Sequence, residues 1–128
     1  MSIREHQYPL MFLALASLAV YSFSLGHEFI PILDDTAYLL SNQAAQGFTL
    51  GHLKSAFTNY FVGNYAPLHI ISYMLDYTLW GLNPTGYHLC NVLLHAVNGV
   101  LFYLVLRREG MSELQSAAAA WIFLFHPV

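Results

Sequence analysis

A long stretch without formal charge constrains this chain more than any other feature. Residues 77–106 contain no Asp, Glu, Lys or Arg. A helix rises 1.5 Å per residue, so about 20 apolar residues cross the roughly 30 Å hydrocarbon core of a bilayer. Asn83-Pro84 and Gly86 break the front of the stretch, which places the predicted spanning helix at residues 87–106.

Two further apolar stretches cover residues 8–26 and 114–128. A cleaved signal peptide is the competing interpretation of the first stretch. Because this stretch is long and only a weak cleavage site follows it, we interpret it as an uncleaved anchor. Charged residues make up only 9% of the chain, against about a quarter in soluble domains. The sequence therefore predicts an all-α membrane protein with three transmembrane helices, forming a single partial membrane domain over residues 1–128.

Basic residues set the predicted orientation. Arg4 precedes the first span, and Arg107 and Arg108 follow the second. Because such residues favour the cytoplasmic side, we expect a cytoplasmic N-terminus and an outer loop over residues 27–86, in which Lys54 is the only Lys or Arg.

The outer loop is expected to be partly helical. Thr49 is a suitable cap for a short helix. Residues 67–80 begin with Pro67 and are followed by Gly81, which are typical helix start and stop signals. This segment is too short to span a bilayer, so we predict an amphipathic helix lying in the lipid interface. Its predicted apolar face comprises Leu68, Ile71, Leu75 and Leu79.

Two adjacent carboxylates, Asp34 and Asp35, follow the first span on the predicted outer side. A carboxylate near apolar surface resists ionisation, which suits a general base that removes a proton from an acceptor hydroxyl. Such a pair can also bind a divalent cation. The structural alternative is that one aspartate caps a helix running through Gln46 while the other is solvated. From the residues alone, both interpretations stay open.

The second span carries a polar stripe on one helical face, formed by His88, Asn91, His95 and Asn98. Polar groups inside a membrane need partners. They either line a cavity that descends from the outer face or hydrogen-bond to neighbouring helices. The two interpretations are equally good for His88, whereas Asn98 favours interhelical bonding.

Several function classes are excluded by the sequence. With four Lys and Arg and a net charge of −3, no basic surface is available for nucleic acid. Neither His-Glu-x-x-His nor Cys-x-x-Cys occurs, so no zinc site is expected, and a glycine-rich phosphate loop is also missing. His69, Ser72 and Asp76 lie along one predicted helix and cannot form a hydrolytic triad with one another.

Four segments together resemble a known family. They read DDTAYL at residues 34–39, NYAPL at 64–68, GLNPTGYHLCNVLLH at 81–95 and FHPV at 125–128. In this order they resemble the N-terminal part of polytopic membrane glycosyltransferases of the GT-C class. Within that class, the likeness is to the TPR-containing membrane O-mannosyltransferases and their bacterial relatives.

The resemblance implies a GT-C-type membrane domain that moves a sugar from a polyprenyl-phosphate donor to an acceptor on the outer face. Asp34 and Asp35 match the acidic motif; Asp34 is the first choice for the base and Asp35 for a supporting or cation-binding carboxylate. His88 and His126 match family motif positions and are implied substrate-binding residues that contact the donor phosphate. Asn91, which shares the polar stripe with His88, is the third candidate substrate-binding residue. The implied location is a bacterial inner membrane.

The resemblance also implies parts that these 128 residues do not contain. In the family, the His-Pro-Val motif is followed by a Glu in a second outer loop, by further spans and by TPR repeats. We therefore expect the chain to be inactive alone and to need other membrane helices. The alternative is a small three-span membrane protein that acts as a non-catalytic interaction or assembly subunit, with the alanines at 117–120 as packing surface.

Overall fold

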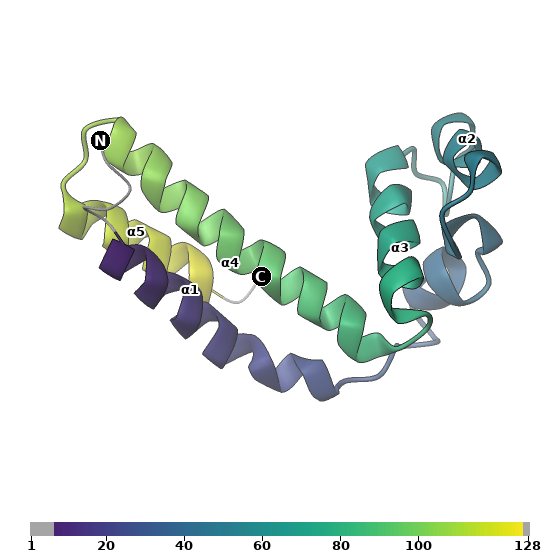
Figure 1. Ribbon diagram of the computed structural model, residues 1–128, viewed down its shortest axis with the longest axis horizontal. Helices are drawn as coiled ribbons and strands as arrows, with labels where there is room; N and C mark the ends of the chain where they lie inside the picture. Colours follow the sequence, from purple (N-terminus) through teal and green to yellow (C-terminus); the bar gives the residue numbers. More distant parts are fainter. Residues whose placement is uncertain (1–6, 127–128) are drawn as a thin grey trace. The chain divides into compact units, whose positions relative to one another are not determined.

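The computed structural model describes residues 7–126, and every regular element within that range is a helix. The chain divides into two compact units (Figure 1). The first, here called the three-helix unit, contains residues 7–25 and 89–126 of the described range; the second, here called the connecting unit, is Gly26–His88.

Among residues 7–126, two helices are long and apolar enough to cross a membrane. The first comprises α1 (Gln7–Tyr21) and the 3-10 helix η2 (Ser22–Gly26), and its apolar span Tyr8–Gly26 has the bounds predicted from the sequence. The second is α4 (Pro84–Arg108), which begins three residues earlier than predicted. Pro84 starts this helix rather than breaking it, because the first turn needs no N–H from that position and Asn83 Oδ1 accepts a hydrogen bond from Thr85 N at 3.2 Å.

The predicted third span is a shorter helix than a membrane crossing requires. α5 (Glu113–Phe125) has 13 residues, which correspond to about 20 Å. It starts with a capping box in which Ser112 and Gln115 bond reciprocally. The predicted end of the span at residues 127–128, like Arg4, lies outside the described residues.

The three-helix unit is held by a small apolar core contributed by all three helices. Its buried members are Leu13 of α1, Tyr103 of α4, and Ala120 and Leu124 of α5. A Cβ atom built on Gly99 would lie 2.4 Å from a methyl carbon of Leu124, so glycine leaves the space on α4 that the Leu124 side chain of α5 fills.

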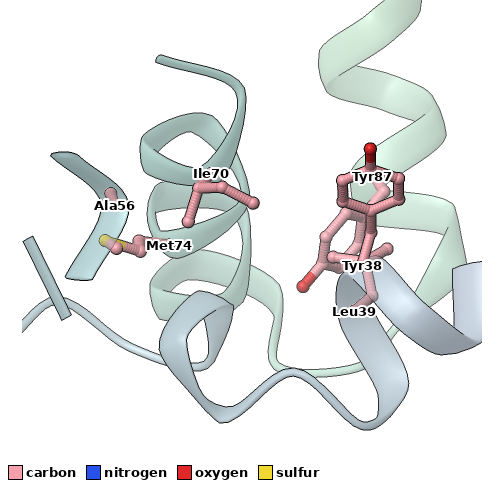
Figure 2. Packing of buried hydrophobic residues seen from close by; sticks show 6 residues of the cluster. All are labelled: Tyr38, Leu39, Ala56, Ile70, Met74 and Tyr87. Carbon is pink, nitrogen blue, oxygen red and sulfur yellow. The ribbon is translucent and has the colours of Figure 1, made fainter. Parts of the chain in front are cut away.

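The connecting unit packs two helices, α2 (Leu50–Thr58) and α3 (Pro67–Trp80), against two short helical turns. The helix α3 has the predicted bounds, and Thr49 Oγ1 caps α2 as expected by accepting a hydrogen bond from His52 N at 3.1 Å. Figure 2 shows the core of this unit, whose buried residues are Tyr38, Leu39, Ala56, Ile70, Met74 and Tyr87.

The single helix predicted through Gln46 is wrong. The segment instead forms a π-helical turn, η3 (Thr36–Leu40), and a 3-10 turn, η4 (Gln43–Ala45). Side chains cause the break: Ser41 Oγ donates to Thr36 O at 2.7 Å, and Asn42 Oδ1 accepts from Ala44 N at 3.1 Å. Such local bonds compete with a continuous helical ladder.

The face of α3 that packs inside the unit differs from the apolar face marked out in the sequence. Ile70 and Met74 are fully buried, whereas Leu68, Leu75 and Leu79 of the predicted face are exposed. Its fourth member, Ile71, is partly buried against the core, so the helix is apolar on two sides and the predicted side stays mostly exposed. The placement of this exposed side at a lipid surface stays a prediction.

Candidate functional site

An open hollow in the connecting unit brings together residues from the start of the unit and its end. It has a volume of about 690 Å³ and lies wholly within Gly26–His88. Its lining is mostly apolar, with four side chains that can ionise; the lining residues are His27, Glu28, Phe29, Ile30, Pro31, Ile32, Asp35 and His88. A mostly apolar concavity with a few polar groups is the usual form of a small binding site.

Asp35 is fixed at one side of this hollow by the backbone before it. Its Oδ2 accepts a hydrogen bond from Ile30 N at 2.7 Å, and the neighbouring Thr36 Oγ1 donates to Pro31 O at 2.6 Å. Asp35 immediately precedes η3, but its side chain makes no capping bond there. The capping role considered for this pair is therefore wrong for Asp35: its half-buried carboxylate turns back toward the hollow.

Asp34 has a different environment from its neighbour. Its side chain is exposed, and it is not among the residues that line the hollow. Both carboxylates are nevertheless close enough to act on Tyr73 of α3. Burial raises the pKa of the Tyr73 hydroxyl above its usual value of 10.0, and the negative charges of Asp35, Asp76 and Asp34 raise that pKa further.

His88 contributes the polar group at the other end of the unit. Its ring lies edge-on to that of His27, with 6.4 Å between the ring centroids. The Nε2 atom of His88 is buried and has no hydrogen-bond partner among residues 7–126. A buried ring nitrogen without a partner costs free energy.

His27 and Glu28 are site residues that the sequence did not single out. They directly follow the first apolar span, which is the only signal that marks them. They reach the site because the chain from 27 to 35 turns back on itself, through the bonds from Ile30 N to Asp35 Oδ2 and from Leu33 N to Ile30 O.

The residues of the polar stripe on α4 have different environments. His95 is structural: its Nε2 lies 3.1 Å from Leu124 O, which also accepts a hydrogen bond from Tyr21 OH at 2.8 Å. Leu124 lies in the last turn of α5, where carbonyl groups lack intrahelical donors, so Tyr21 and His95 satisfy that helix end. Asn91 and Asn98 are exposed on the same helix.

The remaining predicted substrate-binding residues lie in the three-helix unit. Asn91 follows His88 by one turn of α4, and His126 is an exposed residue directly after α5. The hollow therefore unites Asp35 and His88, and it includes neither Asn91 nor His126.

The described residues do not form a metal site by themselves. Within residues 7–126, no three His, Cys, Asp or Glu side chains are grouped so that they could hold a metal ion. The predicted divalent cation would need further ligands from elsewhere, so no chemical step is assigned to it.

Comparison with known proteins gives relatives of one kind. The chain is 34% identical over 107 residues to the protein O-mannosyl-transferase TMTC3 of Mus musculus, and this alignment covers 76% of the chain. It is 28% identical over 138 residues to TMTC4 of Homo sapiens, covering 91% of this chain. It is 42% identical over 65 residues to Tmtc1 of Drosophila melanogaster, covering 51%.

These alignments cover only a short part of the relatives. The matched segments amount to 11% of TMTC3, 19% of TMTC4 and 8% of Tmtc1. No family model matches the chain, and no solved structure matches it either.

Proposed function

Since the chain is homologous to the TMTC protein O-mannosyl-transferases over a short part of their length, we propose that it supplies the acceptor-activating part of a membrane glycosyltransferase. The sugar is mannose, the donor is a polyprenyl-phosphate-linked sugar and the acceptor is a hydroxyl of a polypeptide. The reaction takes place on the outer face of the membrane, which the connecting unit faces.

Asp35 is the proposed general base. The acceptor hydroxyl donates its hydrogen bond to the Asp35 carboxylate, and the hydroxyl oxygen attacks the anomeric carbon of the sugar. A new carbon–oxygen bond forms while the bond between the anomeric carbon and the phosphate oxygen breaks. The polyprenyl phosphate leaves with the electron pair, and the proton passes to Asp35.

One observation carries this assignment: Asp35 lines the same hollow as His88, and its carboxylate is oriented by Ile30 N at 2.7 Å. That bond occupies one carboxylate oxygen and leaves the other for the acceptor. A base that is already oriented avoids part of the entropic cost of reaching a reactive geometry. Asp34, which the family resemblance made the first choice for the base, is exposed next to Asp35 in the chain and is the alternative base.

The location at the outer membrane face is supported by chain connectivity. The connecting unit begins where the first candidate span ends, at Gly26, and it ends in the first turns of the second, which starts at Pro84. Both of its ends are therefore tied to the same membrane surface. Arg107 and Arg108 at the far end of α4 favour the cytoplasm for the opposite side.

Sugar transfer by the protein expressed from its own locus tests this proposal. Membranes that contain the tagged protein are mixed with a radiolabelled polyprenyl-phosphate mannose and a threonine-containing peptide. We expect label in the peptide, and none when alanine replaces the threonine. Absence of transfer, or transfer from a sugar nucleotide in place of the lipid-linked donor, would contradict the proposal.

A further inference from the structure

We propose that the hollow binds the acceptor, a hydroxyl-bearing polypeptide segment with apolar and basic neighbours, rather than the phosphate of the sugar donor. The proposal rests on the proposed function, because the acceptor is the substrate from which Asp35 removes a proton. It goes further in assigning one substrate to this surface and in predicting which acceptor sequences are preferred.

Charge is the first argument. The connecting unit holds four carboxylates, at positions 28, 34, 35 and 76, and Lys54 as its single Lys or Arg, so its formal net charge is −3. Glu28 and Asp35 line the hollow itself, and no Lys or Arg does. A phosphate placed here would meet like charges, whereas a lysine or arginine beside a neutral hydroxyl would be attracted.

Hydrogen bonding is the second argument. The hollow presents the Asp35 carboxylate, which only accepts hydrogen bonds when ionised. An alcohol supplies the O–H donor that this carboxylate can accept, whereas a phosphate without a proton has only acceptors.

The apolar part of the lining is the third argument. Phe29, Ile30, Pro31 and Ile32 all line the hollow, and the side chain of Ile32 is 91% exposed. Such an apolar lining gains free energy by covering an apolar side chain next to the hydroxyl. The preferred acceptor is therefore a Ser or Thr flanked by apolar and by Lys or Arg residues.

Binding of peptides to the full chain tests the proposal without any transfer reaction. The 128-residue chain is held in micelles of an uncharged detergent, and fluorescence anisotropy follows two labelled peptides. Both contain one Thr between apolar residues, and they differ only in carrying two Lys or two Glu beside it. We expect the Lys peptide to bind about 2- to 25-fold more tightly at low salt, since each exposed charge pair changes affinity by about 1.4- to 5-fold. The preference should shrink as salt is added.

Two single substitutions test whether the preference for the Lys peptide arises in the hollow. Glu28→Gln removes one charge from the hollow at an exposed position, and it should lower the preference for the Lys peptide by about 1.4- to 5-fold. Glu109→Gln removes the same charge just after α4, outside the hollow, and should leave the preference unchanged. Equal binding of the two peptides, or equal effects of the two variants, would overturn the proposal.

A short-chain prenyl phosphate distinguishes the two substrates. If the hollow held the donor phosphate, this probe would displace the Lys peptide, and Glu28→Gln would strengthen its binding. Charge-selective peptide binding without sugar transfer from the native protein would support peptide binding in the hollow and contradict the transferase. Transfer without any preference between Lys and Glu peptides would support the transferase and contradict the acceptor assignment.

Discussion

Adding one methyl group at Gly86 should destabilise the connecting unit, although Ala is the better helix former. Gly86 lies in the first turn of α4, two residues before His88, and a Cβ atom built there would lie 2.2 Å from Trp80 Cγ and 2.6 Å from Trp80 Cβ. These atoms are close to the backbone of α3, so the indole cannot rotate away without moving the end of that helix. Overpacking costs up to about 3 kcal/mol, and the gain in helix propensity is about 1 kcal/mol. We therefore expect Gly86→Ala to lower the free energy of unfolding by about 2 kcal/mol.

A second glycine in the same unit provides a control of opposite sign. Gly51 in α2 is exposed, and the nearest atom to its added Cβ is Thr49 Oγ1 at 3.8 Å. Gly51→Ala should therefore stabilise the unit by about 0.5 to 1 kcal/mol. Thermal unfolding of both variants in one detergent, followed by far-UV circular dichroism, measures the difference, with about 4 to 8 °C expected per kcal/mol. A Gly86→Ala melting temperature equal to or above that of wild type would refute the close packing of α3 on the start of α4.

Three further perturbations have expected outcomes. Val62 has a φ of 50° and precedes Gly63 with a φ of 78°, a left-handed conformation that Asn adopts more easily than Val. Val62→Asn should therefore raise the free energy of unfolding by about 1 to 2 kcal/mol in chemical denaturation, and a lower free energy of unfolding would contradict the assigned turn. Because the pKa of Tyr73 is raised in the folded state, its hydroxyl loses the proton at a lower pH in the unfolded state. The free energy of unfolding should therefore fall as pH rises above about 10, and Tyr73→Phe should reduce that fall in thermal melts at alkaline pH. Tyr21→Phe and His95→Leu each remove a hydrogen-bond donor to the same carbonyl, Leu124 O. In a double-mutant cycle, their effects on the free energy of unfolding should be coupled by about 0.5 kcal/mol or more, and strictly additive effects would argue against the shared acceptor.

Local signals predicted the helices of the connecting unit well. Thr49, Pro67 and Gly81 act on the backbone beside them, and the bounds of α3 follow from the last two. The break of the predicted helix after Leu40 was missed, because it depends on side-chain bonds of Ser41 and Asn42 that a propensity argument does not include.

The packed face of α3 could not be predicted from the sequence. Both the Ile70–Met74 side and the Leu68–Leu75 side are apolar, so hydrophobic pattern alone does not say which one faces the protein. The choice is made by the fold of the connecting unit, which places Ala56 in the same core as Ile70 and Met74. For the same reason, the sequence pattern could not show which candidate residues line one site.

The sequence identified Asp35 and His88 as separate candidates, each with a structural alternative. It could not predict that they line one hollow, because they are far apart along the chain and the turn of residues 27–35 forms much of that lining. For His95, the structural alternative is the one that the hydrogen bond to Leu124 O supports.

Sugar transfer by the Asp35→Asn variant of the natively expressed protein tests the central claim most directly. An asparagine side chain can still accept the hydrogen bond from Ile30 N but cannot take a proton from the acceptor, so the fold is kept and the base is lost. We predict a fall in kcat of about 10²- to 10⁴-fold, with a much smaller effect of Asp34→Asn as the matched control. Transfer retained by Asp35→Asn and abolished by Asp34→Asn would contradict the assignment of the base, and transfer retained by both would contradict the site.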